Sequence, residues 1–472
     1  MTELSDLDLV AVAECISKGE ITAEAACQAT LARLRGVGKE LNAVARLNEE
    51  DALETARRVD RTRAAGKPLG PLGGVTLAHK DLFHRQGRIS AGGSVILRDF
   101  RAAETATILS RLDGAGAIDA GALNMAEFAL SPTGYNKHHG MARNPWDTVR
   151  ATGGSSSGSG AVVAARAVPA SLGSDTGGSV RLPAAMCGIV GLKPTQYAVS
   201  RHGIMPLAPN LDSAGPLART ARDLARLMDV IAGPDERDPA TRHSQSGGYE
   251  AALSGDLEGL RIAIPRSNEY DAVAPEIARG LAQVQAVLRE LGITLVETRA
   301  GDMAAARAFH NVVVTVEAAS WHREWLETRP QDYSDNVRRR IEPGLTVTGT
   351  RYFEAMSARD RVRADWLAAS LAGADAAVTP MLPLGVPTIE ESENDEPEAA
   401  RKLIEACTRF TRGINYLGLP ALSVPCGFDE RGLPLAFQLV GAPFAEGVLL
   451  NIADRYQNVT DWHRRKPPVH AI

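Results

Sequence analysis

The chain has 472 residues, of which 44% are hydrophobic and 23% charged, a composition that excludes a disordered or fibrous protein. Its 52 basic and 57 acidic side chains give a net charge of −5, which argues against nucleic acid as a partner. Five widely spaced cysteines without a CxxC pair argue against structural zinc and a disulfide framework, and the short apolar runs and acidic N-terminus predict a cytoplasmic protein without membrane spans or a signal peptide.

The first part of the chain combines a helical segment with short strands. Residues 5–65 carry apolar side chains at helical spacing, with Ser5 and Thr22 placed to cap the first two helices. A turn-rich stretch at 70–74 then leads into an apolar strand that ends next to Lys80. The expected elements, in chain order, are a strand at 75–78, a helix at 107–112, a strand at 117–121, a loop at 130–160, a helix at 161–167 and a strand at 170–172.

The second part of the chain continues the alternation of strands and helices. A polar, irregular stretch at 233–248 predicts a surface connection, and the acidic run at 390–398 is interpreted as a solvated loop. Alternating strands and helices are typical of an α/β fold with a largely parallel sheet. The elements expected between these two stretches are a strand at 260–264, a strongly periodic helix at 277–291 and a strand at 294–297.

Two glycine-rich loops that carry serine lie between Gly153 and Thr195, on either side of a predicted helix and strand. A flexible Gly/Ser linker would explain the first loop, but predicted ordered elements follow it at once. The Asp-Thr-Gly triplet at 175–177 matches the active-site triplet of aspartic proteases. That chemistry needs two carboxylates that share a proton, and the sequence has no second triplet of this kind. Residues 154–158 match the GxSxG pattern of a nucleophile elbow centred on Ser156, but such an elbow follows a buried strand and the preceding residues do not form one. A phosphate-binding loop is excluded because neither glycine-rich loop has the required lysine.

Acyl transfer by serine without histidine remains as the chemistry of these loops. A serine hydroxyl is a weak nucleophile until a base takes its proton. A lysine can be that base where burial lowers its pKa enough to keep the amine neutral. Lys80, at the end of a predicted buried strand, is the candidate. Taken alone, an ordinary surface lysine is the simpler interpretation.

Taken together, the motifs resemble those of the amidase signature family of hydrolases. The similarity covers about residues 7–455, is weakest at about 234–380, and implies a single α/β domain over 1–472. The family fold has a mixed central sheet covered by helices on both faces, here with an N-terminal helical segment at about 1–65. The matching segments are GGSSSG at 153–158, Gly173 to Pro183, Cys187 to Thr195, Lys80-Asp81, Asn124 to Phe128, Arg143 to Trp146, Gly418 to Pro425 and Gly432 to Pro434.

The resemblance assigns a role to each residue of the two loops. Ser179 corresponds to the nucleophile, Ser155 to the serine that follows a cis peptide bond and bridges to the lysine, and Lys80 to the base. Glycines suit the second loop because converging amides require backbone angles that are costly for other residues. The oxyanion hole would consist of the backbone N–H groups of Thr176, Gly177, Gly178 and Ser179, with Ser156, Asp175 and Arg181 in supporting positions.

The substrate pocket is expected to draw on the variable stretch at about 234–380 and on the loop near Met125. A place in the core is the commoner role for aromatic side chains, and both interpretations stay open. The departures from the family pattern at Ala122-Leu123 and Ala436 affect local substrate contacts rather than the proposed triad. The candidate pocket side chains are Met125, Phe128, Trp321, Trp325, Tyr352 and Phe353.

The resemblance implies hydrolysis of a carboxylic amide, or of a related anilide, ester or carbamate, through an acyl-Ser179 intermediate and without a metal or organic cofactor. The partner would be a small-molecule substrate, and a homodimer is an open option. The alternative is the glutaminase subunit of a tRNA-dependent amidotransferase, although residues 131–140 do not resemble the serine- and threonine-rich stretch associated with those subunits. A non-enzymatic scaffold is disfavoured because all three triad residues are present.

Overall fold

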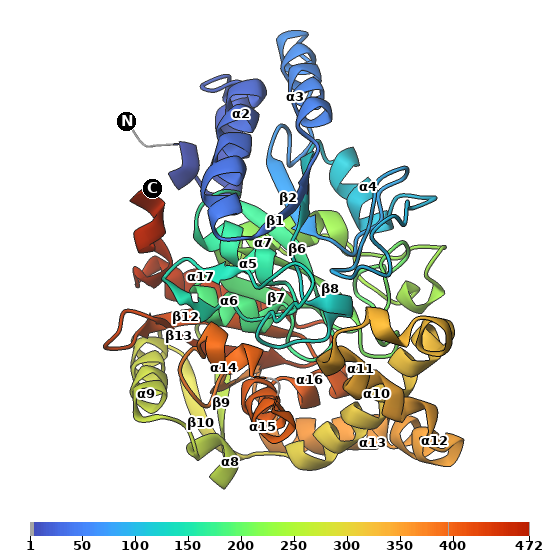
Figure 1. The fold of residues 1–472 in the computed structure, drawn as a ribbon. Coiled ribbons are helices and arrows are strands. Elements are labelled where there is room, and N and C mark those ends of the chain that lie inside the picture. Colours follow the sequence, from blue (N-terminus) through green and yellow to red (C-terminus); the bar gives the residue numbers. More distant parts are fainter. Residues whose placement is uncertain (1–3, 395, 472) are drawn as a thin grey trace.

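An eight-stranded mixed sheet lies at the centre of the computed structural model, which describes residues 4–394 and 396–471 (Figure 1). The strand order is β10-β9-β11-β13-β12-β7-β8-β6. The bounds are β6 (Ala170–Asp175), β7 (Val190–Lys193), β8 (Ser213–Ala218), β9 (Arg261–Arg266), β10 (Thr294–Arg299), β11 (Ala376–Pro380), β12 (Ala421–Phe428) and β13 (Pro434–Gly441).

Most strand pairs of this sheet are antiparallel. Among the described strands of this sheet, the parallel pairs are β9 with β10 and β9 with β11. Strands β12 and β13 form an antiparallel hairpin that joins β11 to β7. The sheet is therefore mixed, and the expectation of a largely parallel sheet from alternating elements is wrong. The turn at 429–433 is too short for a crossover helix, so the strands on either side of it must run in opposite directions.

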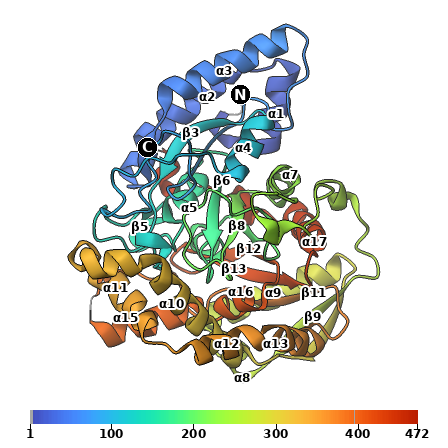
Figure 2. The ribbon, with the colours of Figure 1, turned by 90° about the vertical axis from the view of Figure 1, so that its right-hand side faces the viewer.

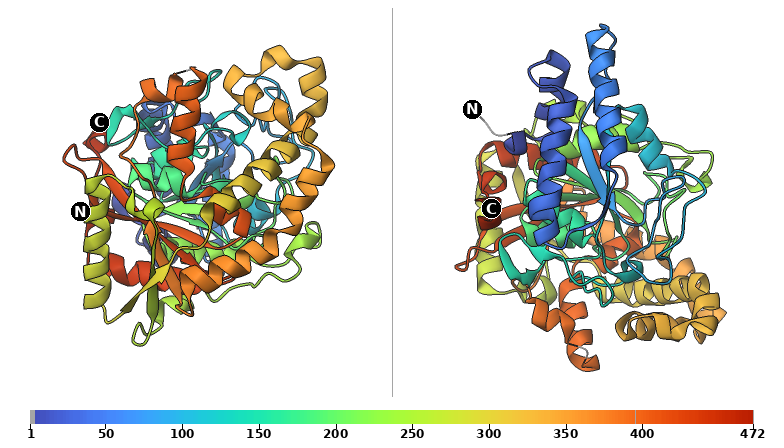
Figure 3. Two further views of the ribbon diagram at one scale, coloured as in Figure 1. Left: turned by 90° about the horizontal axis from the view of Figure 1, so that it is seen from below. Right: turned by 45° about the horizontal axis from the view of Figure 1, so that its top comes forward.

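A second, three-stranded sheet carries Lys80. Its order is β1 (Val44–Leu47), β3 (Ile118–Leu123) and β2 (Thr76–Lys80), and β2 is buried along its whole length. Helices α1 (Leu9–Lys18), α2 (Ala23–Arg33) and α3 (Glu49–Ala64) stand at this end of the molecule, and α2 and α3 project from it side by side (Figures 1 and 3).

The N-terminal segment is helical, as predicted, except for β1. Thr22 caps α2, since its side chain accepts a hydrogen bond from the amide of Ala25 at 3.1 Å. Ser5 does not cap α1, because that helix begins at Leu9 with Asp8 at the N-cap position. Ser5 lies instead in a short 3₁₀ turn at Leu4–Asp6.

Helices flank the central sheet on both sides, and Figure 2 shows α7 and α17 on one side and α10 and α15 on the other. The longest helix, α10, lies at the end of the molecule opposite α2 and α3 (Figure 2). The bounds are α4 (Thr107–Gly114), α5 (Ser157–Ala164), α6 (Arg181–Cys187), α7 (Ala221–Ile231), α8 (Asn268–Asp271), α9 (Pro275–Glu290), α10 (Met303–Thr328), α11 (Asp335–Ile341), α12 (Gly349–Ser357), α13 (Arg359–Trp366), α14 (Ile389–Glu393), α15 (Pro397–Thr408), α16 (Arg412–Leu417) and α17 (Glu446–Asn458).

Two segments expected to be loops contain regular structure. Within 130–160, β4 (Arg143–Asn144) pairs with β5 (Asp147–Ala151), and α5 already begins at Ser157. In the acidic run at 390–398, residues 390–393 belong to α14 and residues 397–398 begin α15. Asn394 and Glu396 are the cap residues of these helices, and position 395 lies outside the described residues. Acidic side chains favour helix N-termini, and Thr388 and Glu391 form a capping box there.

None of the helices in the described ranges is long and apolar enough to cross a membrane. Within the same ranges, no cluster of three or more His, Cys, Asp or Glu side chains could hold a metal ion.

Candidate active site

Lys80 ends β2 in a fully buried position and is hydrogen-bonded to two serines. Its Nζ lies 2.7 Å from Oγ of Ser155 and 2.8 Å from Oγ of Ser174. Burial disfavours the ammonium form and lowers the pKa of Lys80 to about 7, against the opposing charges of Asp212 and Asp175. Burial therefore favours the neutral amine, which is the form that can accept a proton.

The first glycine-rich loop brings Ser155 between Lys80 and the second loop. The Gly154–Ser155 peptide bond is cis, and the amide of Ser156 donates a hydrogen bond to the carbonyl oxygen of Ser179 at 3.3 Å. Glycine is required at 154 because a side chain there would overlap the backbone of Gly134. The hydroxyl of Ser156 donates to the carbonyl oxygen of Ser174 at 3.4 Å, so this side chain supports the junction of the two loops.

The second glycine-rich loop is held by a buried ion pair. Arg181 donates from Nε to Oδ2 of Asp175 and from Nη2 to Oδ1, both at 3.0 Å. Asn415 adds a hydrogen bond to Oδ1 at 2.8 Å. Arg181 and these hydrogen bonds hold the pKa of Asp175 below its ordinary value, despite burial. The two charged groups fix the loop around Ser179, and neither side chain is exposed to solvent.

One of the four amides expected in the oxyanion hole is already occupied. The N–H of Gly178 donates to Oδ1 of Asp175 at 2.8 Å, so it faces the ion pair and is not available to a substrate. Within the described chain, the amides of Gly177 and Ser179 have no acceptor. This hydrogen bond contradicts the expected role of Gly178, and the amides of Thr176, Gly177 and Ser179 remain as candidates for an oxyanion hole.

Three side chains at this site are not singled out by the sequence. Ser174 is the second partner of Lys80. Asp212 accepts a hydrogen bond from Oγ1 of Thr176 at 2.5 Å, and burial raises the pKa of its carboxyl to about 6. His310, on α10, donates from Nε2 to the carbonyl oxygen of Thr176 at 2.9 Å, and burial lowers its pKa to about 3. A lysine kept in the core needs several oxygen partners, and this requirement is the one signal that points to Ser174.

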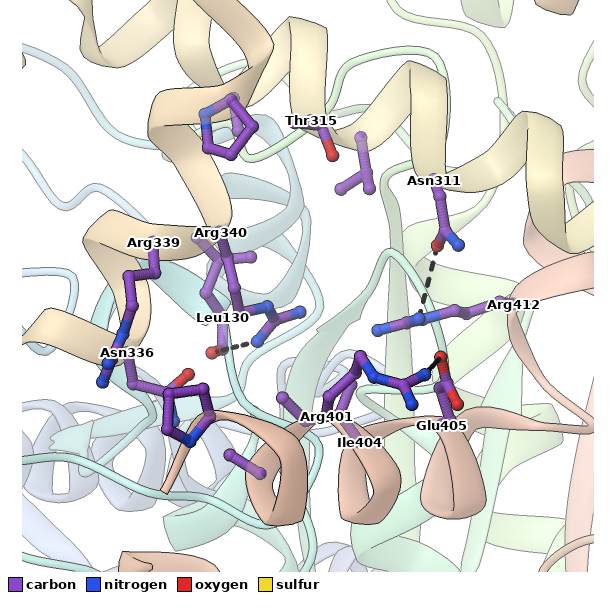
Figure 4. Close-up of a pocket in the computed structure, with 15 residues that line it drawn as sticks. Leu130, Asn311, Thr315, Asn336, Arg339, Arg340, Arg401, Ile404, Glu405 and Arg412 are labelled. Carbon is purple, nitrogen blue, oxygen red and sulfur yellow. Dashed lines mark hydrogen bonds and ion pairs between the residues drawn. The ribbon is translucent and has the colours of Figure 1, made fainter. Parts of the chain in front are cut away.

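Two cavities border the loops. One, of about 250 Å³, is lined by Ser174, Ala129 and Trp321. The other, of about 380 Å³, is lined by residues that include Leu130 and Arg412 (Figure 4). A side chain at Gly177 would lie 3.3 Å from Cγ of Arg412. Ala129 and Leu130 are consecutive, so one short segment contributes a lining residue to each cavity.

The candidate pocket side chains occupy different environments. Trp321 lines the smaller cavity, whereas Phe353 is largely exposed on α12. Met125 is fully buried, and Phe128 stacks on Trp325 in an aromatic cluster that includes His322 and Tyr333. The hydroxyl of Tyr352 donates to Glu317 at 2.7 Å.

The mixed sheet and the buried lysine–serine cluster beside a glycine-rich loop place the chain among the α/β hydrolytic enzymes. The family model described as Amidase matches residues 25–450. The chain therefore belongs to the amidase signature family, whose members hydrolyse carbon–nitrogen bonds other than peptide bonds.

The curated relatives include a glutamyl-tRNA(Gln) amidotransferase subunit from Chloroflexus aggregans, which is 39% identical over 99% of both chains. The subunit of the same name from Bordetella avium is 39% identical over 90% of this chain and 91% of its own length.

Solved structures of similar fold include a chain from a complex described as revealing the origins of an s-triazine catabolic enzyme. It has a TM-score of 0.88 and 34% identity, and covers 96% of this chain and 98% of its own. The peptide amidase of Stenotrophomonas maltophilia has a TM-score of 0.86 and 29% identity over 98% of both chains.

Proposed function

We propose that this chain hydrolyses carboxylic amides through an acyl-Ser179 intermediate, with Lys80 as the base and Ser155 as the relay between them. The observation that carries the proposal is the buried contact of 2.7 Å between Nζ of Lys80 and Oγ of Ser155. A lysine with a pKa of about 7 next to a serine is matched to proton transfer at neutral pH.

In the proposed reaction, Ser155 gives its proton to neutral Lys80 and takes the proton of Ser179. The Oγ of Ser179 then forms a bond to the substrate carbonyl carbon, and the amides of Thr176, Gly177 and Ser179 stabilise the oxyanion. The proton returns along the same relay to the amide nitrogen, and the C–N bond breaks. Water then attacks the acyl-serine, releasing the acid and restoring the Ser179 hydroxyl. The same steps apply to an anilide, an ester or a carbamate, since each presents a carbonyl carbon.

A second candidate function is the glutaminase subunit of an amidotransferase, with glutamine as the amide and a partner subunit that receives the ammonia. The curated relatives favour it, since they are 35–39% identical and bear the name of an amidotransferase subunit. Both candidates use the same covalent chemistry. They differ in substrate and in partner. Whether the isolated chain hydrolyses amides without a second subunit therefore distinguishes the two candidates.

The covalent step is tested by treating the purified chain with an alkyl fluorophosphonate and mapping the adduct by mass spectrometry. We expect one adduct on Ser179, lost in Ser179→Ala and retained in Ser156→Ala. An adduct on Ser156 would overturn the assignment of the nucleophile. Amide hydrolysis by the isolated chain, and its mass in solution, then decide between the two candidates. Glutamine hydrolysis that requires a copurifying subunit would support the second.

A further inference from the structure

The smaller cavity, of about 250 Å³, has a largely apolar wall. A cavity of roughly 150 Å³ holds one benzene ring, so this volume admits a ring with a short linker. Sites for small ligands combine such a wall with a few polar groups that fix the orientation of the ligand. The larger apolar side chains of the lining are Ile204, Met205, Pro206, Leu207, Pro209 and Trp321.

The segment that supplies most of this apolar wall is held by hydrogen bonds of its backbone. The amides of Leu207 and Ala208 donate to Oδ2 of Asp212 at 2.9 and 3.0 Å. The amide of Met205 donates to the carbonyl oxygen of Leu82 at 3.0 Å. The wall is therefore formed before a ligand binds, which lowers the entropic cost of binding.

The charged groups of this cavity are already engaged within the protein. Nη2 of Arg201 lies 2.8 Å from Oδ1 of Asp238, and Nε of Arg237 lies 3.5 Å from Oδ1 of Asp235. The carboxylate of Asp212 accepts three hydrogen bonds from the chain. Among the described lining residues, no arginine is left without a carboxylate partner. An uncharged, mainly apolar ligand group therefore fits this cavity better than an ion.

Ser213 supplies a polar group that has no partner in the fold. It lines the cavity and is only 4% exposed, and among the described residues its Oγ has no hydrogen-bond partner. Such buried polar atoms are uncommon because loss of water without a new hydrogen bond costs free energy. A hydrogen-bonding atom of a ligand would remove this cost. Ser213 thus points to an occupant that is apolar and carries one hydrogen-bonding group.

Trp321 is an exposed aromatic side chain at the same cavity. It extends from α10, lines the cavity and is 57% exposed. A large apolar side chain that borders a pocket and faces solvent is suited to pack on a bound ligand. Ser174 and Ser213, by contrast, are buried. The cavity therefore extends from the surface toward the buried base.

The position of the cavity relative to Lys80 indicates which end of the substrate it receives. Ser174 lines the cavity, and its Oγ lies 2.8 Å from Nζ of Lys80. In the proposed reaction, the leaving nitrogen takes its proton from the relay of Lys80 and Ser155. That nitrogen must face the relay, so a cavity beside Lys80 lies on the nitrogen side of the bond that breaks.

We propose that the smaller cavity binds an apolar, ring-sized substituent of the amide nitrogen, with Ser213 as its hydrogen-bond partner, so that the substrate class is secondary amides of arylalkylamines. The proposal rests on the amide hydrolysis proposed above and keeps its covalent steps. The nitrogen takes the electron pair of the C–N bond and the proton of the relay, and departs as the free arylalkylamine. Glutamine, whose amide nitrogen carries only hydrogen, would leave this cavity unused.

Three amides test the side on which the ring binds. They are N-methylbutanamide, N-(2-phenylethyl)butanamide and N-methyl-4-phenylbutanamide, which carries its ring on the acyl side. The first two form the same acyl-enzyme and release amines of similar basicity, so kcat/KM compares the binding of the two substituents. We expect N-(2-phenylethyl)butanamide to exceed N-methylbutanamide by roughly 10- to 100-fold, as for burial of one phenyl group. The ring on the acyl side should give a smaller gain.

Trp321→Ala should reduce the ratio of kcat/KM for N-(2-phenylethyl)butanamide to that for N-methylbutanamide by several-fold, because the ring loses one of its contacts. Circular dichroism checks that the variant is folded. Phe100→Ala is the control, since this exposed aromatic side chain is not among the lining residues and its ratio should equal that of wild type. Calorimetry with Ser179→Ala protein measures binding of the same amides without turnover.

A hydroxyl group at each of the three ring positions of N-(2-phenylethyl)butanamide tests the role of Ser213. We expect one of the three isomers to exceed the unsubstituted amide in kcat/KM by roughly 3- to 10-fold, as for one added hydrogen bond. Ser213→Ala should abolish this preference. Ser423→Ala should retain it, because Ser423 is also buried with an unpartnered hydroxyl but lies on β12 and is not among the lining residues.

Three results would overturn the assignment of the cavity: equal kcat/KM and equal binding of the N-methyl and N-(2-phenylethyl) amides, an equal or larger gain from the ring on the acyl side, or an unchanged ratio in folded Trp321→Ala. Absence of a preferred isomer would overturn the role of Ser213. The proposed hydrolysis would stand in each case if N-methylbutanamide is cleaved in a Ser179-dependent reaction. Cleavage that survives in Ser179→Ala would overturn the proposed function itself, whatever the selectivity.

Discussion

Nζ of Lys80 lies 2.8 Å from Oγ of Ser174, a residue on the strand that leads into the second glycine-rich loop. The lysine is thus held from two directions, by Ser155 of the first loop and by Ser174 of β6. Two fixed oxygen atoms define the position of a long, flexible side chain that would otherwise retain several rotamers. The hydrogen bond between Lys80 on β2 and Ser174 on β6 also links the three-stranded sheet to the central sheet.

Replacement of Ser174 with alanine is expected to lower kcat by about tenfold. The hydroxyl stabilises the charged amine more than the neutral one, so its loss should also lower the pKa of Lys80 and move the acid limb of the rate profile to lower pH. Ser171→Ala is the control, since this buried serine on the same strand bonds to the carbonyl oxygen of Ala78 instead. A Ser174→Ala profile identical to wild type would contradict a positioning role.

Activity is expected to depend on pH through Lys80. The base must be neutral, and burial lowers its pKa to about 7, so the rate should fall as the pH drops below about 7. A single proton gives roughly a tenfold loss per pH unit below that point. The measurement is kcat/KM against pH for a substrate that does not itself titrate in this range.

Variants at position 80 separate this base from a histidine. Lys80→Ala should lose most activity, and the activity that remains should no longer fall at acidic pH. Lys80→Arg should not restore activity, because a guanidinium stays protonated and cannot accept a proton. Single replacements of His79, His84, His138 and His139 should leave the limb in place. A histidine variant that removes the limb would show that Lys80 is not the base.

Local sequence signals predict individual elements better than their arrangement. The cap at Thr22 and the periodic helix at 277–291 depend on neighbouring residues, and both are present in the structure. The order of strands in the central sheet depends on pairing between segments far apart in the sequence, such as β11 with β13 and β12 with β7, and the alternation of elements does not reveal it. The expectation of a loop at 390–398 is wrong because acidic residues favour solvated loops and helix starts alike.

In the candidate site, too, the sequence predicts individual residues better than the way in which they are brought together. Lys80 and Ser155 are 75 positions apart, and in the sequence only the family resemblance links them. Ser174 lies in the family motif, but nothing in its neighbours indicates that its side chain points toward the lysine. The amide of Gly178 faces Asp175 because the loop is wound around the ion pair, a backbone orientation that residue identity does not encode. Arg412 comes to the loop from a helix more than two hundred positions away.

Asp212→Asn is expected to shift the acid limb in a defined direction. The charge of Asp212 raises the pKa of Lys80 against the effect of burial, so removal of that charge should lower it further. The limb should move to lower pH by about one unit. Asp229→Asn is a matched control, because Asp229 accepts two backbone amides, as Asp212 does, at a site without Lys80. A folded Asp212→Asn enzyme with an unmoved limb would exclude this electrostatic coupling.

Asp175→Asn is expected to destabilise the protein strongly, because it leaves the Arg181 guanidinium buried without its counter-charge. Loss of one partner of a buried ion pair costs about 3–5 kcal/mol, and the free energy of unfolding from urea titration measures it. Asp113→Asn, which removes the charge of a partly exposed partner of Arg85, should cost less than about 1 kcal/mol.

Because the folded-state pKa of Asp175 is depressed, its contribution to stability is complete at neutral pH and is lost only as the pH falls through the acidic range. The difference in unfolding free energy between wild type and Asp175→Asn should therefore be constant from neutral to mildly acidic pH and shrink below that. The variant should also lose kcat, since the carboxylate orients the Gly178 amide and with it the neighbouring amides of the loop. A stable Asp175→Asn enzyme with wild-type kcat would show that the loop keeps its shape without the ion pair.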